Sequence, residues 1–112
     1  MKLAIVGSRT FNDYGLLVSS IKDIPDVTEI VSGGARGADK LAERYAKEKN
    51  IPIKIFLPEW DLLGKSAGYI RNKQIVDYCD KVLAFWDGIS KGTNHSIKIA
   101  ENQKKDCIVK LF

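Results

Sequence analysis

The sequence is short of the residues that usually build metal or disulfide sites. It contains two cysteines, one histidine and three prolines among 112 residues. Cys79 and Cys107 have neither the CxxC nor the metal-ligand spacing of redox and zinc sites, and no pattern of ligands surrounds His95. We therefore expect no metal site, and we expect both cysteines to be reduced, buried thiols.

Long hydrophobic runs are also absent. After Met1 and Lys2 the first apolar run is Leu3–Val6, which is too short for a signal peptide or a membrane span. The prediction is a cytoplasmic protein with no membrane partner. A length of 112 residues suits one domain over residues 1–112. The net charge of +4 allows an anionic partner but does not identify one.

The chain does contain a regular alternation of apolar runs of strand length with amphipathic stretches of helix length. Continuous apolar strands are typical of a parallel sheet that is covered on both faces. The pattern predicts an α/β fold, a single Rossmann-like three-layer domain with a five-stranded parallel sheet in the order 3-2-1-4-5. The expected strands are Lys2–Gly7, Glu29–Ser32, Ile53–Leu57, Lys81–Trp86 and Cys107–Leu111. The expected helices are Asp13–Ile24, Gly37–Lys49, Ala67–Cys79 and Thr93–Gln103, with Asn12 or Asp13 as the first N-cap and an irregular segment at Pro58–Ser66.

The loops that follow the strands are rich in Gly, Ser, Arg and Trp, whereas the opposite strand ends carry ordinary turn residues. Ligands of open α/β sheets bind beyond the carboxyl ends of the strands, near the point where the strand order reverses. Gly33, Gly34 and Gly37 lie between the second strand and its helix, where they can bring backbone amides close to a phosphate. A tight turn without a ligand is the alternative interpretation of these glycines.

Polar and aromatic side chains accompany the glycines. Ser8 and Arg9 directly follow the first strand and suit phosphate oxygens; the alternative is that Arg9 is a surface residue paired with a nearby acid. Asp39 lies in the first turn of the second helix, where a carboxylate is favourable for structural reasons alone. Trp60 and Trp86 could stack on a base, but aromatics at strand ends usually belong to the core or its rim.

Three segments together resemble one family. They are Gly7-Ser8-Arg9-Thr10-Phe11, Ser32-Gly33-Gly34-Ala35-Arg36-Gly37-Ala38-Asp39 and Ala67-Gly68-Tyr69-Ile70-Arg71-Asn72. In this order they are similar to the small YspA/YpsA-related branch of the SLOG superfamily, and the likeness covers nearly the whole chain. The resemblance implies a Rossmann-like nucleotide-binding fold, a phosphate held by the Gly33–Gly37 loop, and Arg71 facing the ligand. Relatives commonly form homodimers, so it also implies a homo-oligomer.

The same superfamily includes phosphoribohydrolases, in which a Gly-Thr opens a helix and a glutamate three residues later takes part in cleaving an N-glycosidic bond. Gly92-Thr93 is similar to that pair, but Ser96 occupies the glutamate position. Ile89-Ser90-Lys91 also replaces the preceding glycines of that motif. A serine cannot act as the same carboxylate, so the resemblance favours binding over turnover.

We therefore expect a protein that binds a nucleotide or a nucleotide-derived molecule similar to NAD or ADP-ribose, as a sensor or a sequestering protein, and that requires no cofactor. The alternatives are an N-glycosidase or phosphoribohydrolase acting on nucleoside monophosphates, and a DNA-associated protein by analogy with the DNA-processing protein of natural transformation. The absence of a basic stripe with interleaved aromatics argues against a nucleic-acid partner. The predicted ligand-binding residues are Gly7, Ser8, Arg9, Ser32, Gly33, Gly34, Ala35, Arg36, Gly37, Asp39, Arg71, Asn72, Asp87, Gly92 and Thr93.

Overall fold

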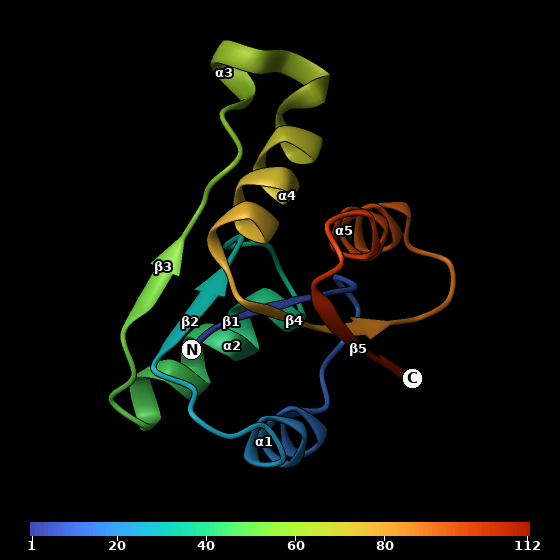
Figure 1. Ribbon diagram of the computed structural model, residues 1–112. Coiled ribbons are helices and arrows are strands. Elements are labelled where there is room, and N and C mark those ends of the chain that lie inside the picture. The colour runs from blue at the N-terminus through green and yellow to red at the C-terminus, as the bar shows by residue number, and fades with distance from the viewer.

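The five strands form one sheet, seen in a computed structural model that describes residues 1–112 (Figure 1). The strand order is β3-β2-β1-β4-β5, and every neighbouring pair is parallel. This confirms the predicted α/β class, the parallel sheet and the order 3-2-1-4-5. The strands are β1 (Lys2–Gly7), β2 (Glu29–Ser32), β3 (Ile53–Ile55), β4 (Lys81–Trp86) and β5 (Asp106–Leu111).

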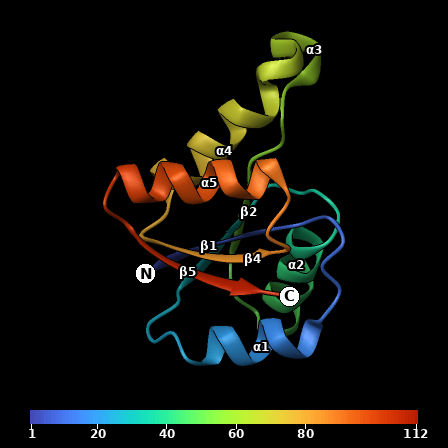
Figure 2. The same cartoon turned by 90° about the vertical axis from the view of Figure 1, so that its right-hand side faces the viewer.

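Helices cover both faces of the sheet, as Figure 2 shows from the side. On one face lie α1 (Tyr14–Lys22) and α2 (Ala38–Glu48), and on the other lie α4 (Ala67–Tyr78) and α5 (Lys91–Asn102). The chain changes direction of winding after β3, so that β1 and β4 become neighbours in the middle of the sheet. None of these helices combines the length and apolar character needed to cross a membrane.

The core explains why the central strands are continuously apolar. Leu3 and Ile5 of β1 pack into the cluster beneath α1 and α2, while Ala4 and Val6 pack into the cluster beneath α4 and α5. Side chains of a strand alternate between its two faces, so all side chains of a strand that is covered on both faces are buried. The strand ends are therefore the only parts of β1 and β4 where polar side chains can gather.

The element boundaries differ from the prediction mainly around β3. The strand ends at Ile55, because Leu57 lies beyond the ladder and is 64% exposed. The predicted irregular segment Pro58–Ser66 contains α3 (Trp60–Leu63) and the 3-10 turn η1 (Gly64–Ser66), which stand away from the sheet (Figure 1). Asp13 is the N-cap of α1, since its Oδ1 accepts a hydrogen bond from the Leu16 amide at 3.0 Å.

Both cysteines carry free thiols, but they differ in exposure. Cys79 is buried at the end of α4, and Cys107 is only half-buried on β5. The expectation that both are buried is therefore wrong for Cys107. Its strand lies at the edge of the sheet, where one side of the ladder has no neighbour.

Candidate functional site

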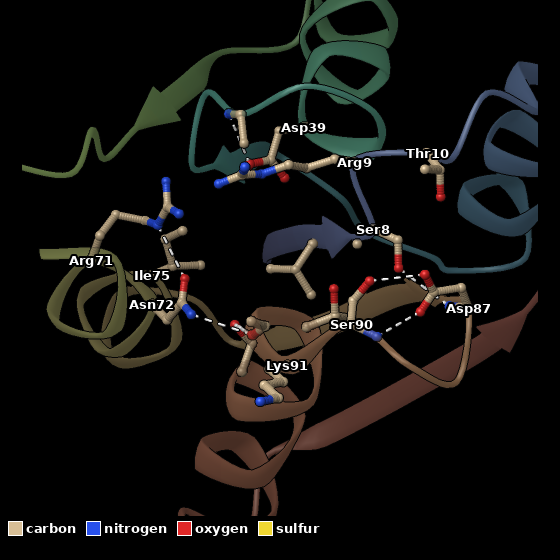
Figure 3. A pocket seen from close by; sticks show the side chains of 16 residues that line it. Ser8, Arg9, Thr10, Asp39, Arg71, Asn72, Ile75, Asp87, Ser90 and Lys91 are labelled. Carbon is tan, nitrogen blue, oxygen red and sulfur yellow. Dashed lines mark hydrogen bonds between the residues drawn. The ribbon is translucent and has the colours of Figure 1, made fainter. Parts of the chain in front are cut away.

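A cavity of about 350 Å³ opens beyond the carboxyl ends of β1 and β4, where the strand order reverses (Figure 3). This is the position expected for a ligand in a doubly wound sheet. Loops after β1, β2 and β4 contribute to it, together with the middle of α4 and the first turns of α2 and α5. The lining residues are Val6, Gly7, Ser8, Arg9, Thr10, Ala35, Asp39, Arg71, Asn72, Ile75, Asp87, Ser90, Lys91, Gly92, Thr93 and Ser96.

Asp87 shapes the loop between β4 and α5. Its Oδ1 accepts hydrogen bonds from the amides of Ile89 at 2.9 Å and Ser90 at 2.7 Å, and its Oδ2 accepts one from the Ser90 hydroxyl at 2.9 Å. These bonds, led by the Ser90 and Ile89 amides, lower the pKa of Asp87 to about 2. The Asp87 amide in turn donates to Oγ of the buried Ser8 at 3.2 Å, which joins this loop to the end of β1.

After this loop, α5 begins at the edge of the cavity, and its first backbone amides make no hydrogen bond. No side chain caps this end, and the amides of Lys91, Gly92 and Thr93 have no hydrogen-bond partner within the chain. A Cβ added at Gly92 would meet nothing within 4 Å, so a ligand can approach the backbone there. Unpaired amides at the positive end of a helix are a ready-made binding site for an anion.

Arg71 and Asn72 face this helix end from α4, across the cavity from Ser8 and Asp87 (Figure 3). Nε of Arg71 donates to Oδ1 of Asn72 at 3.0 Å, and Nδ2 of Asn72 donates to the Gly92 carbonyl at 3.3 Å. Nη1 of Arg71 donates to the Gly33 carbonyl at 2.6 Å. The guanidinium is thus held between the loop after β2 and the first turn of α5, and it stays charged in this setting.

Asp39 is a buried carboxylate on the opposite wall. Burial raises its pKa to about 6, although a hydrogen bond from the Ala35 amide and the charge of Arg71 partly oppose the rise. The Ala35 amide donates to Oδ2 of Asp39 at 3.1 Å. Because Asp39 stands in the first turn of α2, that helix end already holds an acidic group, whereas the end of α5 holds none.

The glycines of the loop after β2 face protein atoms rather than the cavity. Gly37 has a φ of +77°, and a Cβ there would lie 2.7 Å from the Arg9 carbonyl oxygen. A Cβ at Gly34 would lie 2.6 Å from Cδ2 of Leu57, and one at Gly33 would lie 2.6 Å from Nη1 of Arg71. At these three positions the absence of a side chain lets the loop pack closely against other parts of the same chain. This agrees with the interpretation of the motif as a tight turn.

The cavity brings together ten of the fifteen predicted ligand-binding residues. Ser32 and Gly37 lie outside it, because Ser32 is fully buried beneath the loop and Gly37 packs against the backbone after β1. Gly33, Gly34 and Arg36 line an adjoining hollow of about 410 Å³ instead. The complete lining of that hollow is Arg9, Gly33, Gly34, Ala35, Arg36, Leu57, Pro58, Trp60 and Arg71.

Sequence reasoning missed six lining residues as ligand contacts: Val6, Thr10, Ile75, Ser90, Lys91 and Ser96. Two of them carry a signal in the sequence, since Ser90 and Lys91 immediately precede the Gly92-Thr93 pair. Ile75 had another, because it lies one helical turn after Arg71 and so shares its face. Val6 is a core residue of β1 whose exposure to the cavity only the packing reveals.

No group in the cavity is arranged as an obvious nucleophile or metal ligand. Oγ of Ser96 donates to the Gly92 carbonyl at 3.4 Å, so its hydroxyl proton is used within α5. His95 lies outside the lining, where its ring packs edge-on against Tyr69 at 4.5 Å between centroids. No three His, Cys, Asp or Glu side chains gather in a way that could hold a metal ion.

Comparison with known proteins places this chain among relatives over nearly its whole length. Residues 1–62 match the model of the family described as "YspA, cpYpsA-related SLOG family". The Gene 61 protein of Mycobacterium phage D29 is 34% identical over 110 residues, which cover 89% of this chain and 88% of that protein.

Two solved structures share the fold at low sequence identity. DNA processing protein A (DprA) from Streptococcus pneumoniae superposes with a TM-score of 0.76 at 21% identity, covering 96% of this chain and 49% of that one. DNA processing protein A from Helicobacter pylori gives a TM-score of 0.74 at 22% identity, covering 97% of this chain and 64% of that one. The chain therefore spans only about half of the first protein and less than two thirds of the second.

These structures overturn the argument against a nucleic-acid partner. The Helicobacter protein, whose structure describes a single-stranded DNA binding mode, has the same fold, so the fold does not exclude this class of ligand. A basic surface does not need a continuous basic stripe in the sequence. Arg9, Arg71 and Lys91 are far apart in the chain, and only folding gathers them around one cavity.

The family model covers more than half of the chain, and the phage protein matches most of the rest. The chain belongs to the YspA, cpYpsA-related SLOG family.

Proposed function

We propose that this protein binds a nucleotide or nucleotide-derived molecule by holding its phosphate at the N-terminus of α5. The observation that carries the proposal is the set of free amides at Lys91, Gly92 and Thr93, in a cavity that Arg9 and Arg71 also line. Backbone amides and guanidinium groups are the two donors that proteins use most effectively for phosphate oxygens.

The charge and size of the cavity support this ligand class. Arg9, Arg71 and Lys91 outnumber the carboxylates of Asp39 and Asp87, and both carboxylates are already engaged by backbone amides. A volume of about 350 Å³ lies within the range of pockets that take small molecules, roughly 300–1,000 Å³. A nucleoside monophosphate is a ligand of suitable size and charge.

Binding without turnover is the form of the proposal that the side chains favour. Ser96 takes the position of the glutamate in related phosphoribohydrolases, and its hydroxyl is bonded to a helix carbonyl. Asp87 has a pKa of about 2, too low for a general acid near neutral pH, because two backbone amides stabilise its charged form. The role that follows is that of a sensor or a sequestering protein.

The test is a thermal scan with nucleoside monophosphates, NAD and ADP-ribose. A ligand at one hundred times its dissociation constant adds about 2.7 kcal/mol of stability, which is a rise in melting temperature of roughly 10 °C for a domain of this size. Arg71→Ala should abolish the shift, while Lys73→Ala, an exposed cation on the same helix, should keep it. The proposal fails if millimolar concentrations of these ligands leave the wild-type melting temperature unchanged.

Incubation of each stabilising ligand with the protein, followed by chromatography, tests the absence of turnover. Intact ligand after many hours agrees with a binding protein. Release of free base or ribose phosphate over many turnovers would make the protein an N-glycosidase. Asp39, which lines the cavity with a pKa of about 6, would then be the first candidate for the acid.

Single-stranded DNA is a second candidate ligand, and the fold shared with DNA processing protein A from Helicobacter pylori is the observation that favours it. Anisotropy of a labelled oligonucleotide at several salt concentrations tests this candidate. If the cavity holds a phosphate of the strand, Arg71→Ala weakens binding and reduces the salt dependence by about one unit of slope. Binding that Arg71→Ala leaves unchanged would place the DNA elsewhere.

A further inference from the structure

The hollow that adjoins the cavity has the lining of a base-binding site. We propose that it is a second subsite, which takes the base of a second nucleoside unit, so that the full ligand consists of two nucleosides joined through phosphate. This inference rests on the proposed function, because the first phosphate is taken to lie at the N-terminus of α5. The hollow has a volume of about 410 Å³, comparable to that of the first cavity.

The two spaces meet at a pair of arginines. Arg9 and Arg71 line both, so their guanidinium groups stand at the boundary between them. Burial lowers the pKa of Arg71, and the nearby positive charge of Arg9 lowers it further, against the opposing effect of Asp39. A phosphate linker placed between the two guanidinium groups would relieve this repulsion and would connect the two subsites.

Trp60 provides the surface on which a base can stack. It is 52% exposed, and it lies on α3, the short helix that stands away from the sheet (Figure 1). The indole is supported from one side by the first turn of α4, because a Cβ added at Gly68 would lie 3.4 Å from Cη2 of Trp60. Indole rings bind every nucleobase through its π-face, with little dependence on sequence.

The rest of the hollow suits a nucleoside rather than a purely apolar group. Arg36 is exposed and brings a third guanidinium group beside Trp60, while Leu57 and Pro58 supply apolar contact. Arginine planes stack on bases and also bind phosphate oxygens. An apolar ligand would leave the arginines unused, and a single nucleotide in the first cavity would leave Trp60 uncovered.

Calorimetric titration of the full chain with ligands of one and of two nucleosides tests the subsite. The one-nucleoside probes are AMP, GMP, CMP and UMP. The two-nucleoside probes are NAD, in which a pyrophosphate joins the 5′ carbons, and 5′-phosphorylated dinucleotides, in which a 3′–5′ phosphodiester joins the nucleosides. NAD represents a free dinucleotide ligand, and the phosphodiester-linked dinucleotides represent a short piece of a nucleic-acid strand. We expect at least one two-nucleoside probe to bind more tightly than every monophosphate.

Trp60→Ala is the decisive variant. It should weaken the tighter two-nucleoside probe by about fivefold to a hundredfold, the usual effect of losing one aromatic stack, and weaken the monophosphates by less than twofold. Leu62→Ala is the matched control, since Leu62 is 76% exposed on the same short helix and lines neither space, and it should change no affinity. Trp60→Phe, which keeps an aromatic ring, should retain most of the affinity and also serves if Trp60→Ala does not fold.

The outcomes separate this inference from the proposed function. If the monophosphates bind and no two-nucleoside probe binds more tightly, or if Trp60→Ala weakens both classes equally, the second subsite is refuted and the phosphate site stands. If the wild-type protein binds none of the probes, the proposed function is refuted and the subsite with it.

Discussion

Replacing Asp39 with asparagine should change how the stability of the protein depends on pH. Burial raises the pKa of Asp39 from an ordinary value of 3.8 to about 6. The folded protein therefore keeps the proton over a pH range where the unfolded chain has already lost it. The stabilising contribution of this group is complete below about pH 3.8 and is lost as pH rises through about 6.

The size of the effect follows from the shift. A difference of about two pKa units corresponds to about 3 kcal/mol at 1.36 kcal/mol per unit. Asparagine is neutral at every pH and can still accept the hydrogen bond from the Ala35 amide through Oδ1. The free energy of unfolding of Asp39→Asn minus that of the wild type should therefore increase by about 2.4 kcal/mol between pH 4 and pH 7, which is most of the full effect.

Urea unfolding followed by circular dichroism at pH 4, 5, 6 and 7 measures this difference, because groups that titrate alike in both proteins cancel. Asp87→Asn is a useful contrast. The pKa of Asp87 is lowered to about 2, so its contribution is present above about pH 3.8 and is lost as pH falls toward 2. A difference for Asp39→Asn that stays constant from pH 4 to pH 7 would show that this carboxyl is not held in a low-dielectric site.

Three further predictions concern the loops around the cavity. Gly37→Ala should lower the free energy of unfolding by about 2 kcal/mol or more, because its positive φ and the nearby Arg9 carbonyl exclude a side chain; urea unfolding measures the loss. Gly92→Ala should leave stability unchanged or raise it by up to about 1 kcal/mol in the same assay, because this glycine lies in the first turn of a helix with open space beside it; a loss comparable to that of Gly37→Ala would contradict the account. Asn72→Ala should lower phosphate affinity, measured by calorimetry, by about threefold to tenfold, because Arg71 loses its link to α5; unchanged affinity would mean that Arg71 needs no such support.

The fold was predictable because its signals are local and agree with one another. β1 and β4 are continuous apolar runs, and each is followed by a stretch with helical periodicity, which leaves a parallel sheet with crossover helices as the simplest solution. The signal weakens at β3, where Lys54 and Ile55 are exposed at the edge of the sheet. The predicted end of this strand at Leu57 is two residues too late, because Leu57 is apolar like a strand residue but is exposed beyond the ladder.

The site was predictable only in its position. Strand-end loops identified Ser8, Arg9 and Asp87, because the topology brings all these ends to one edge of the sheet. The role of the glycines was not predictable. A glycine that leaves room for a ligand and a glycine that leaves room for Leu57 or for an arginine side chain look the same in a sequence. Trp60 was noticed as a strand-end aromatic, but its exposure depends on how α3 stands away from the sheet, and no local pattern encodes that placement.

The helices that follow β2 and β4 both begin at the edge of the sheet where the ligand is expected, and we assign the phosphate to the second of them. The end of α5 offers free amides beside Lys91, whereas the first turn of α2 already contains the carboxyl group of Asp39. The resemblance-based expectation, by contrast, puts the phosphate in the Gly33–Gly37 loop. The two assignments predict different amides in contact with the ligand.

An amide-resolved NMR titration of the ¹⁵N-labelled protein with AMP, at a constant pH of 7, distinguishes them directly. We expect saturable shifts that are largest at the amides of Lys91, Gly92 and Thr93, and we expect Arg71→Ala to remove them at the same AMP concentrations. Largest shifts at Gly33–Gly37 that leave the start of α5 unaffected, or no saturable shift at either helix, would contradict the claim that this protein holds a nucleotide phosphate at the N-terminus of α5.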